Sequence, residues 1–306
     1  MKLNVVREIL DQTQSILISF LLIFKSDGPE SQCAAYVTDN PGYKLLNELV
    51  AAWQDEITRE LPPALLDQSS TATSPISIAT YNDFIQEFLK STQVDCIVSP
   101  ANSFGLMDGG LDLTISKYYG GVARLVPIVR SALVDEWCGQ QNVGTCVLVD
   151  TQKLIQGANH GNNVPRYIAH VPTMRVPKLL LPDDDIAYRC TWALLTAVRK
   201  HNNEILKQDQ TRTGGERINT VLCSGFGTGI GNFPLQECAR QMVLAVKHFA
   251  ERTSSNSTNE DDLRGSSHLM TLWDKAERIE DAVCCVVPEK SGETPSSPCT
   301  FEVLGK

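Results

Sequence analysis

The sequence contains 306 residues, of which 42% are hydrophobic and 21% are charged, and its formal net charge is −9. This length is sufficient for one large domain or two modest ones with a buried core. The acidic balance argues against bulk binding to nucleic acid or to anionic membranes, because both present phosphate groups. The acidic balance does not exclude a small anionic ligand, since backbone amides and helix N-termini bind phosphate without Lys or Arg.

The ten cysteines contain neither a C-x-x-C pair nor a Cys/His cluster with zinc spacing, so we expect no metal site. We also expect no bound cofactor. Cys96 and Cys223 lie in apolar, strand-like runs, and Cys190 and Cys238 lie on apolar helical faces. This placement is typical of small buried hydrophobic residues in a reducing compartment.

The longest apolar run covers residues 16–24 and is interrupted only by Ser19. It is far shorter than the about 20 residues that span a bilayer. It also follows an acidic, polar segment and lacks a small-residue cleavage site, which argues against a signal peptide. We interpret it as a buried strand and expect a cytoplasmic or nuclear protein without a membrane partner.

Residues 1–74 are expected to form an N-terminal extension packed on the main domain, where it either adds a strand and a helix to the sheet or covers a binding cleft. An apolar stripe predicts a helix over residues 43–61, which the Pro-Pro pair at 62–63 ends. The other expected elements are a weakly helical stretch at 1–14, strand-like stretches at 15–24 and 34–38, and a polar linker at 67–74.

Residues 75–252 alternate short apolar runs with longer segments of helical period, which predicts an α/β core with a mostly parallel sheet. The expected strands are 76–80, 96–100, 146–150, 167–171 and 220–223. The expected helices are 83–89, 111–119, 122–137, one that begins at 186, and one that begins at 234. Beyond this core we expect a disordered insertion at 253–268, followed by a C-terminal helix and tail over 269–306.

Two glycine-rich loops leave this predicted sheet at strand ends, over residues 100–112 (PANSFGLMDGGLD) and 224–234 (SGFGTGIGNFP). Ligands of open α/β sheets bind beyond such ends. Glycines let backbone N–H groups approach an oxyanion closely, and the following helix N-terminus adds positive potential. Each loop alone is equally compatible with a flexible turn, but two in one sheet favour a phosphate site. Neither matches G-x-x-x-x-G-K-[ST], and Ile230 breaks G-x-G-x-x-G.

Three segments carry a family resemblance: VDCIVSPANSFGLMDGGLD at 94–112, IAHVP at 168–172, and VLCSGFGTGIGNFPLQECA at 221–239. In order and spacing they resemble the macrodomain family of ADP-ribose-binding and Appr-1″-p processing proteins. The resemblance covers residues 75–252. Within the family, the sequence is most similar to macrodomain-like proteins of fungi and phages. The resemblance implies a three-layer α/β/α sandwich around a mixed, mostly parallel central sheet.

The resemblance also implies roles for individual residues. Asn102 corresponds to the asparagine that binds the distal ribose, and Asp112 to the aspartate that orients a water in hydrolytic members. A hydrolytic activity would therefore rest on Asp112 and Asn102. Asp83 or Asn82 is the candidate to hold the adenine amine. The remaining implied ligand contacts are Ala101, Gly109, Gly110, Leu111, Ser224, Gly225, Phe226, Gly227, Thr228, Gly229, Ile230 and Gly231.

The sequence departs from the family pattern at two positions. Ser116 stands where many hydrolytic members have a histidine, and Gly231 stands where an aromatic residue often stacks on the ligand. Phe226 and Phe104 are the candidates to stack instead.

Two further residues near the strand ends allow two interpretations each. We interpret His170 as a satisfied core histidine rather than a base, and Arg175 as either a phosphate contact or a surface residue.

The resulting hypothesis is a module that binds ADP-ribose or an ADP-ribose derivative, either free or attached to an ADP-ribosylated protein. The alternative is a hydrolase of ADP-ribose esters or of ADP-ribose 1″-phosphate, which would remove ADP-ribosylation. A more distant alternative is a scaffold that has kept the fold and lost the ligand.

Overall fold

The structure is a computed structural model, and it describes residues 16–22, 41–61, 76–82, 85–156, 163–208 and 217–254. The strands are β1 (Ile16–Leu22), β2 (Ile76–Asn82), β3 (Cys96–Ser99), β4 (Val147–Asp150), β5 (Tyr167–His170) and β6 (Thr220–Cys223). The helices are α2 (Pro41–Glu60), α4 (Ile85–Ser91), α5 (Gly110–Tyr118), α6 (Val122–Trp137), α7 (Gln152–Gln156), α8 (Ile186–Gln208) and α9 (Leu235–Ser254).

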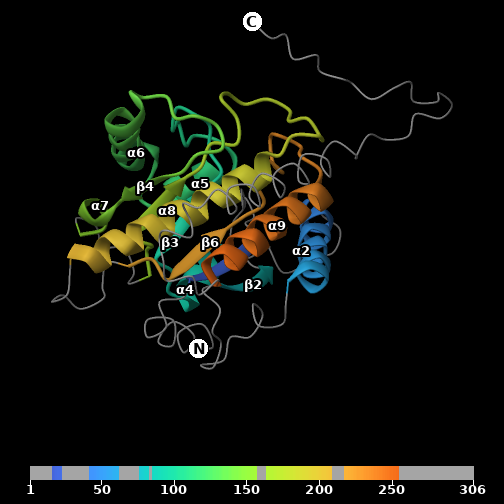
Figure 1. Cartoon of the computed structure of the whole chain (residues 1–306). Helices are drawn as coiled ribbons and strands as arrows, with labels where there is room; N and C mark the ends of the chain where they lie inside the picture. Colours follow the sequence, from blue (N-terminus) through green and yellow to red (C-terminus); the bar gives the residue numbers. More distant parts are fainter. Residues whose placement is uncertain are drawn as a thin grey trace, which may run out of the picture.

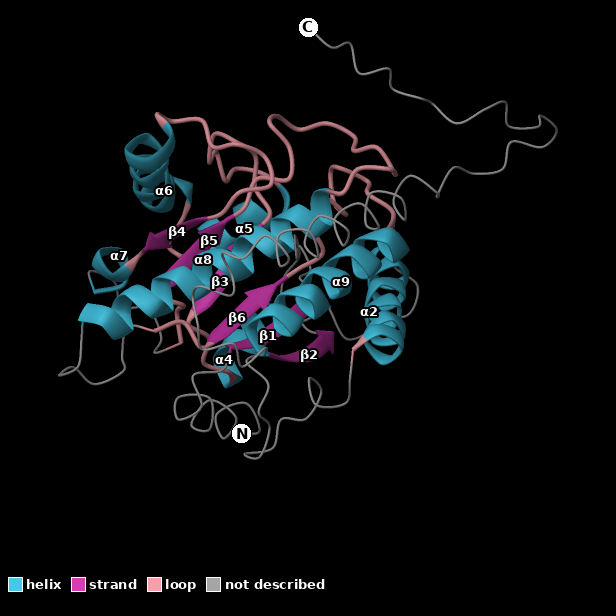
Figure 2. Cartoon of the chain, in the orientation of Figure 1, coloured by secondary structure: helices cyan, strands magenta, loops and turns pink. Residues whose placement is uncertain are grey.

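The strands form one six-stranded sheet in the order β2-β1-β6-β3-β5-β4 (Figures 1 and 2). Neighbouring strands are parallel except for β4, which pairs antiparallel with β5. The expectation of a mixed, mostly parallel sheet is therefore confirmed. None of the described helices is long and apolar enough to cross a membrane.

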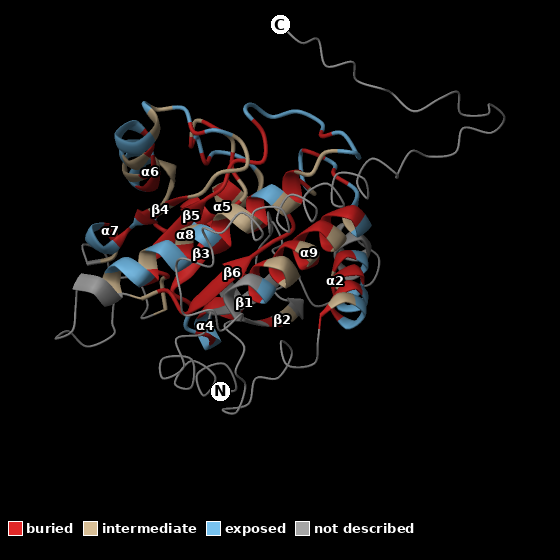
Figure 3. Cartoon of the chain, in the orientation of Figure 1, coloured by how far each residue is buried: buried red, intermediate tan, exposed pale blue. Residues whose placement is uncertain are grey.

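Helices cover both faces of the sheet, which gives the three layers of an α/β/α sandwich. On one face, side chains from α2, α8 and α9 form a single cluster with alternate strand residues such as Cys96 and Val98. On the other, α4, α5, α6 and α7 pack around Ile97 and Leu222. Strands β3, β5 and β6 are buried along their whole length (Figure 3), as parallel strands between two helical layers must be.

Two elements from before residue 75 belong to this sandwich. Strand β1 lies between β2 and β6 in the sheet. Helix α2 packs against α9 (Figure 1). Its Trp53 side chain is fully buried in the core cluster on that face of the sheet. The elements expected at 1–14, 34–38 and 67–74 lie outside the described residues, as do residues 255–306.

The expected cysteine environment is confirmed where the structure describes it. Cys96, Cys190, Cys223 and Cys238 are free thiols with fully buried side chains. Burial raises the pKa of each thiol above its usual value. They therefore stay protonated and behave as small apolar residues in the core.

A buried carboxylate joins the amino ends of β3 and β6. Asp95 Oδ2 accepts hydrogen bonds from the Asn219 N–H, the Thr220 N–H and the Thr220 hydroxyl, each at 2.9 Å. The Asp95 N–H in turn donates to Thr220 O. This arrangement fixes the register of the two central strands at the edge opposite the glycine loops.

Replacing Asp95 by alanine should lower the free energy of unfolding by about 3 kcal/mol, because three buried donors would lose their acceptor. The matched control is Asp150→Ala, which removes an exposed ion pair to Arg166 at 2.7 Å and the hydrogen bond from the Gln152 N–H at the start of α7. This variant should cost only about 1 kcal/mol. Urea denaturation of the two variants measures the difference. An equal decrease in the free energy of unfolding in both variants would show that Asp95 does not stabilise the pairing of β3 with β6.

Candidate functional site

The sheet topology places the two glycine loops side by side. Strands β3 and β6 are parallel neighbours, so the loops at 100–109 and 224–234 leave the same sheet edge. Strand β5 flanks β3 on its other side and brings residues 171–175 to that edge. Figure 2 shows these long loops gathered beyond the sheet at the top of the view. The sequence motifs therefore converge on one region.

Asn102 is fixed by its backbone and by one side-chain oxygen. It forms a parallel bridge with Met174, and its Oδ1 accepts the Phe104 N–H at 2.9 Å. The side chain is only partly buried. Within the described part of the chain, its Nδ2 donates to no protein acceptor. That N–H₂ group is therefore available to a ligand hydroxyl.

The turn that follows depends on a glycine and a serine. Gly105 has φ +60°, and a Cβ there would lie 3.0 Å from both Val129 Cγ1 and Leu133 Cδ1 on α6. Ser116, buried in α5, donates its hydroxyl to Met107 O at 2.8 Å. Ser116 thus holds the turn in place. Its position in the sequence did not predict this role.

The amino end of α5 is open. Its N-cap Gly109 provides no side-chain hydrogen bond, and a Cβ added at Gly109 or Gly110 would meet nothing within 4 Å. The N–H groups of Gly110, Leu111 and Asp112 find no acceptor among the described residues. Unpaired amides at the positive end of a helix dipole form a surface suited to an anion.

Asp112 is the buried carboxyl beside this surface. Its side chain lies in the first turn of α5, and Ser99 at the end of β3 donates its hydroxyl to Asp112 Oδ1 at 2.6 Å. Burial raises the pKa of Asp112 to about 6, against the lowering effect of the Ser99 hydrogen bond, and the charge of Asp108 adds to the rise. The group therefore exchanges a proton near neutral pH.

The second loop exposes its tip and buries its base. Gly229 and Ile230 are exposed and Thr228 is partly exposed, and a Cβ at Gly229 would meet nothing within 4 Å. The N–H groups of these three residues donate to no acceptor in the part of the chain that the structure describes. A second set of open amides therefore stands at the same edge as the end of α5.

The base of this loop needs its glycines for packing. A Cβ at Gly225 would lie 2.7 Å from Leu49 Cδ2, and one at Gly227 would lie 2.5 Å from Leu180 Cδ1. The Thr228 hydroxyl donates to Gly225 O at 3.2 Å, which closes the turn. Ser224 is buried beside these glycines at the end of β6.

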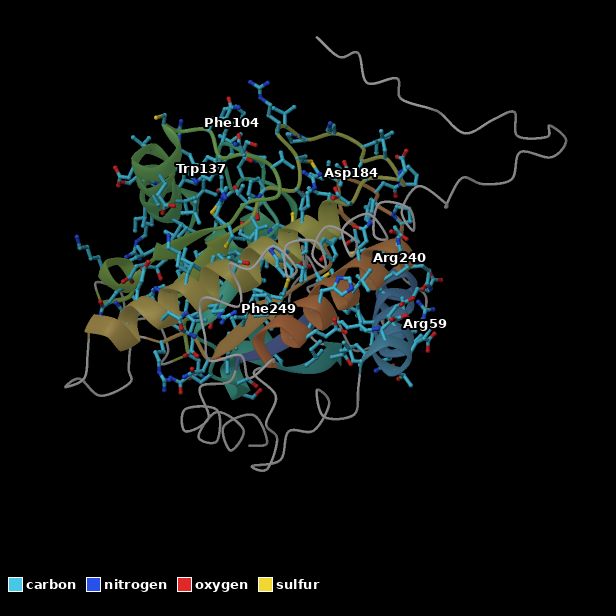
Figure 4. All side chains as sticks on the ribbon, in the orientation of Figure 1. Arg59, Phe104, Trp137, Asp184, Arg240 and Phe249 are labelled. Carbon is cyan, nitrogen blue, oxygen red and sulfur yellow. The ribbon has the colours of Figure 1, made fainter. Side chains whose placement is uncertain are left out.

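Of the two aromatic candidates for ligand stacking, only one reaches the surface. Phe226 is fully buried in the core cluster beneath α8 and α9, so the expectation that its ring stacks on a ligand is wrong. A glycine on each side lets the backbone turn the side chain inward. Phe104 is partly exposed on the first loop (Figure 4).

The remaining predicted site residues contribute less to this geometry. The Ala101 N–H donates to Ser99 O and Val171 O, both at 3.0 Å, so Ala101 ties the first loop to β5. Asn82 ends β2, and Asp83 lies outside the described residues. The Arg175 side chain is exposed and donates to Gln140 Oε1 at 3.3 Å, which favours the surface reading.

His170 is a core residue, as expected, but only one of its ring nitrogens is satisfied. Nδ1 lies 2.6 Å from Gln141 Oε1, and the Gln141 amide donates to His170 O at 3.1 Å. Nε2 has no partner among the described residues. Burial lowers the pKa of His170 to about 4, so the ring is neutral at physiological pH.

The raised pKa of Asp112 should appear in the pH dependence of stability. The folded state holds this proton more tightly than the unfolded chain, so the associated stability is present below about pH 4 and is lost as pH rises through about 6. Asp112→Asn, which imitates the protonated form, should therefore become more stable relative to wild type by up to about 3 kcal/mol between about pH 4 and pH 7. Urea denaturation at several pH values measures this, and a pH-independent difference would contradict it.

The sequence is similar to those of known proteins. The model of the macro-like domain family matches residues 82–260. An uncharacterized protein of Aquifex aeolicus (strain VF5) is 26% identical over 162 residues, which cover 53% of this chain and 78% of that protein.

Among the described residues, no group of three or more His, Cys, Asp or Glu could hold a metal ion.

Solved macrodomains are also similar. The Oceanobacillus iheyensis macrodomain with MES bound is 18% identical, with a TM-score of 0.38 over 52% of this chain and 71% of that one. The Trypanosoma brucei macrodomain in complex with ADP-ribose is 17% identical, with a TM-score of 0.38 over 76% of this chain and 89% of that one. Since the family match alone spans more than half of the sequence, the chain belongs to the macro-like domain family.

Proposed function

We propose that the protein binds ADP-ribose or an ADP-ribose derivative between its two glycine loops. The observation that carries the proposal is the pair of open amide sets at one sheet edge. One set is at the amino end of α5, and the other is at residues 228–230. A pyrophosphate presents acceptor oxygens on two sides and fits between two such sets. ADP-ribose is the pyrophosphate that the loop resemblance implies.

The amides also explain how an acidic protein holds an anionic ligand. Because the net charge of the protein is −9, long-range electrostatics do not attract an anionic ligand to it. Unpaired N–H groups and a helix dipole act only at short range, where the local potential is positive. Binding should therefore rest on direct hydrogen bonds rather than on Lys or Arg contacts.

The rest of the ligand has candidate partners around these amides. The Asn102 amide is free to donate to a ribose hydroxyl, and the open space at Gly109 and Gly110 leaves room for the sugar. Phe104, which is partly exposed on the first loop, is the proposed stacking residue, and Asn82 or Asp83 remains the proposed adenine contact. The same site would accept ADP-ribose that is attached to a protein, provided that the linkage points outward.

A second candidate function is hydrolysis of an ADP-ribose ester or of ADP-ribose 1″-phosphate. Asp112 favours it, because a buried carboxyl with a pKa of about 6 suits a general base near neutral pH. Above that pKa the carboxylate would take a proton from water as the water attacks the ester carbonyl carbon or the phosphorus. The bond from that atom to the ribose oxygen would then break, and the ribose oxygen would receive the proton from Asp112. The loop amides would stabilise the charge that develops on the attacked group.

The binding proposal is tested by calorimetric titration of the protein with ADP-ribose. We expect micromolar affinity for wild type and about a tenfold loss or more in Asn102→Ala, since one ligand hydrogen bond disappears. Asn142→Ala, which changes an exposed asparagine on another loop, should bind as wild type does. No heat and no thermal shift at millimolar ligand would reject the proposal.

The hydrolase candidate is tested by release of ADP-ribose from an ester-linked peptide, or of inorganic phosphate from ADP-ribose 1″-phosphate. Asp112→Asn should lower the rate by about a hundredfold or more while keeping the affinity for ADP-ribose. The wild-type rate should rise with pH through about 6, as the carboxyl loses its proton. Equal rates in the two proteins would exclude Asp112 as the base.

A further inference from the structure

One short segment contacts the backbone of both glycine loops. Residues 174–181, which we call the strap, follow β5 along the candidate site. At one end, the Ser103 N–H in the first loop donates to Met174 O at 3.2 Å and to Arg175 O at 3.3 Å. Near the other end, the Leu180 N–H donates to Gly231 O in the second loop at 2.8 Å. The strap therefore connects the two loops directly.

Within the strap, Leu180 differs from its neighbours. Its side chain is only 9% exposed and belongs to the core cluster, whereas Leu179 is 73% exposed and Leu181 is 68% exposed. Three consecutive leucines thus include a single one that packs inward. The side chains of the other two project into solvent.

The Leu180 side chain packs under the second loop. A Cβ built at Gly227 would lie 2.5 Å from Leu180 Cδ1, and one at Gly231 would lie 2.8 Å from the same atom. These two glycines bracket residues 228–230, the tip with the open amides. The leucine methyl group therefore occupies the space beneath both ends of the tip, whereas a Cβ added at Gly229, within the tip, would meet nothing within 4 Å.

We propose that Leu180 is the positioning residue for the second glycine loop, and that through the strap it sets the placement of that loop relative to the first. This inference rests on the proposed binding function. A loop held in its bound conformation loses less entropy when the ligand arrives, so packing beneath the tip raises affinity without touching the ligand. Removing that packing should weaken binding while the fold persists.

The test is calorimetric titration with ADP-ribose of Leu180→Ala beside two matched leucine variants. Leu180→Ala should bind about tenfold more weakly, because the loop must be ordered on binding. Leu179→Ala makes the same change one residue away, on an exposed side chain, and should bind as wild type does. Leu194→Ala, in the middle of α8 and 1% exposed in the same core cluster, should lower the thermal midpoint but leave the affinity unchanged.

Two further variants separate loop positioning from general loss of stability. Leu180→Met keeps the volume and should recover affinity to within about threefold of wild type. Leu180→Val is the milder truncation to use if alanine prevents folding, and it should give an intermediate loss of affinity.

The outcomes are distinct. If wild type does not bind ADP-ribose, the proposed function fails and this inference fails with it. If wild type binds and Leu180→Ala binds equally well, only the positioning role is overturned. A loss in Leu194→Ala as large as in Leu180→Ala would also overturn it, since stability alone would then explain the effect. Weaker binding confined to Leu180 variants, with recovery in Leu180→Met, would support it.

Discussion

Strands β3 and β6 pair in parallel in the middle of the sheet, and both glycine loops take their positions from this pairing. Cys96 pairs with Val221 and Ile97 with Leu222, and both strands are buried on both faces. At their amino ends Asp95 closes the pair with three hydrogen bonds. At their carboxyl ends each strand runs directly into a glycine loop. A slip in this register would separate the two sets of open amides.

The sequence predicts the elements that carry a strong periodic signal. The apolar runs at β3, β5 and β6 lie within a residue of their expected bounds, and the stripe over α6 gives both of its ends correctly. Helix α7 (Gln152–Gln156) was not predicted, because five residues are too few to show a helical period. The apolar stripe of the helix that begins at 186 ends at Val198 in the sequence. Helix α8 continues for ten residues beyond it, through a mostly polar stretch.

The loops show why site geometry is harder to predict than element type. Glycine spacing located both loops, but side chains in a loop follow no period, so nothing indicated that Phe226 points inward. The same holds for the three leucines at 179–181, of which only the middle one is buried. The role of Ser116 depends on Met107 O, nine residues earlier in the chain, and only the folded turn brings these groups together.

The position of β1 inside the sheet, between β2 and β6, has a consequence for how the chain folds. Leu17 pairs with Thr220, so the contact joins residues roughly 200 positions apart. Strand β1 can pair with β2 soon after both have been synthesised, but its other edge stays open until β6 has been synthesised. Closing that long loop costs entropy before any contact compensates it. The central sheet, and with it the neighbouring glycine loops, is therefore completed late in folding, after almost the whole domain has emerged.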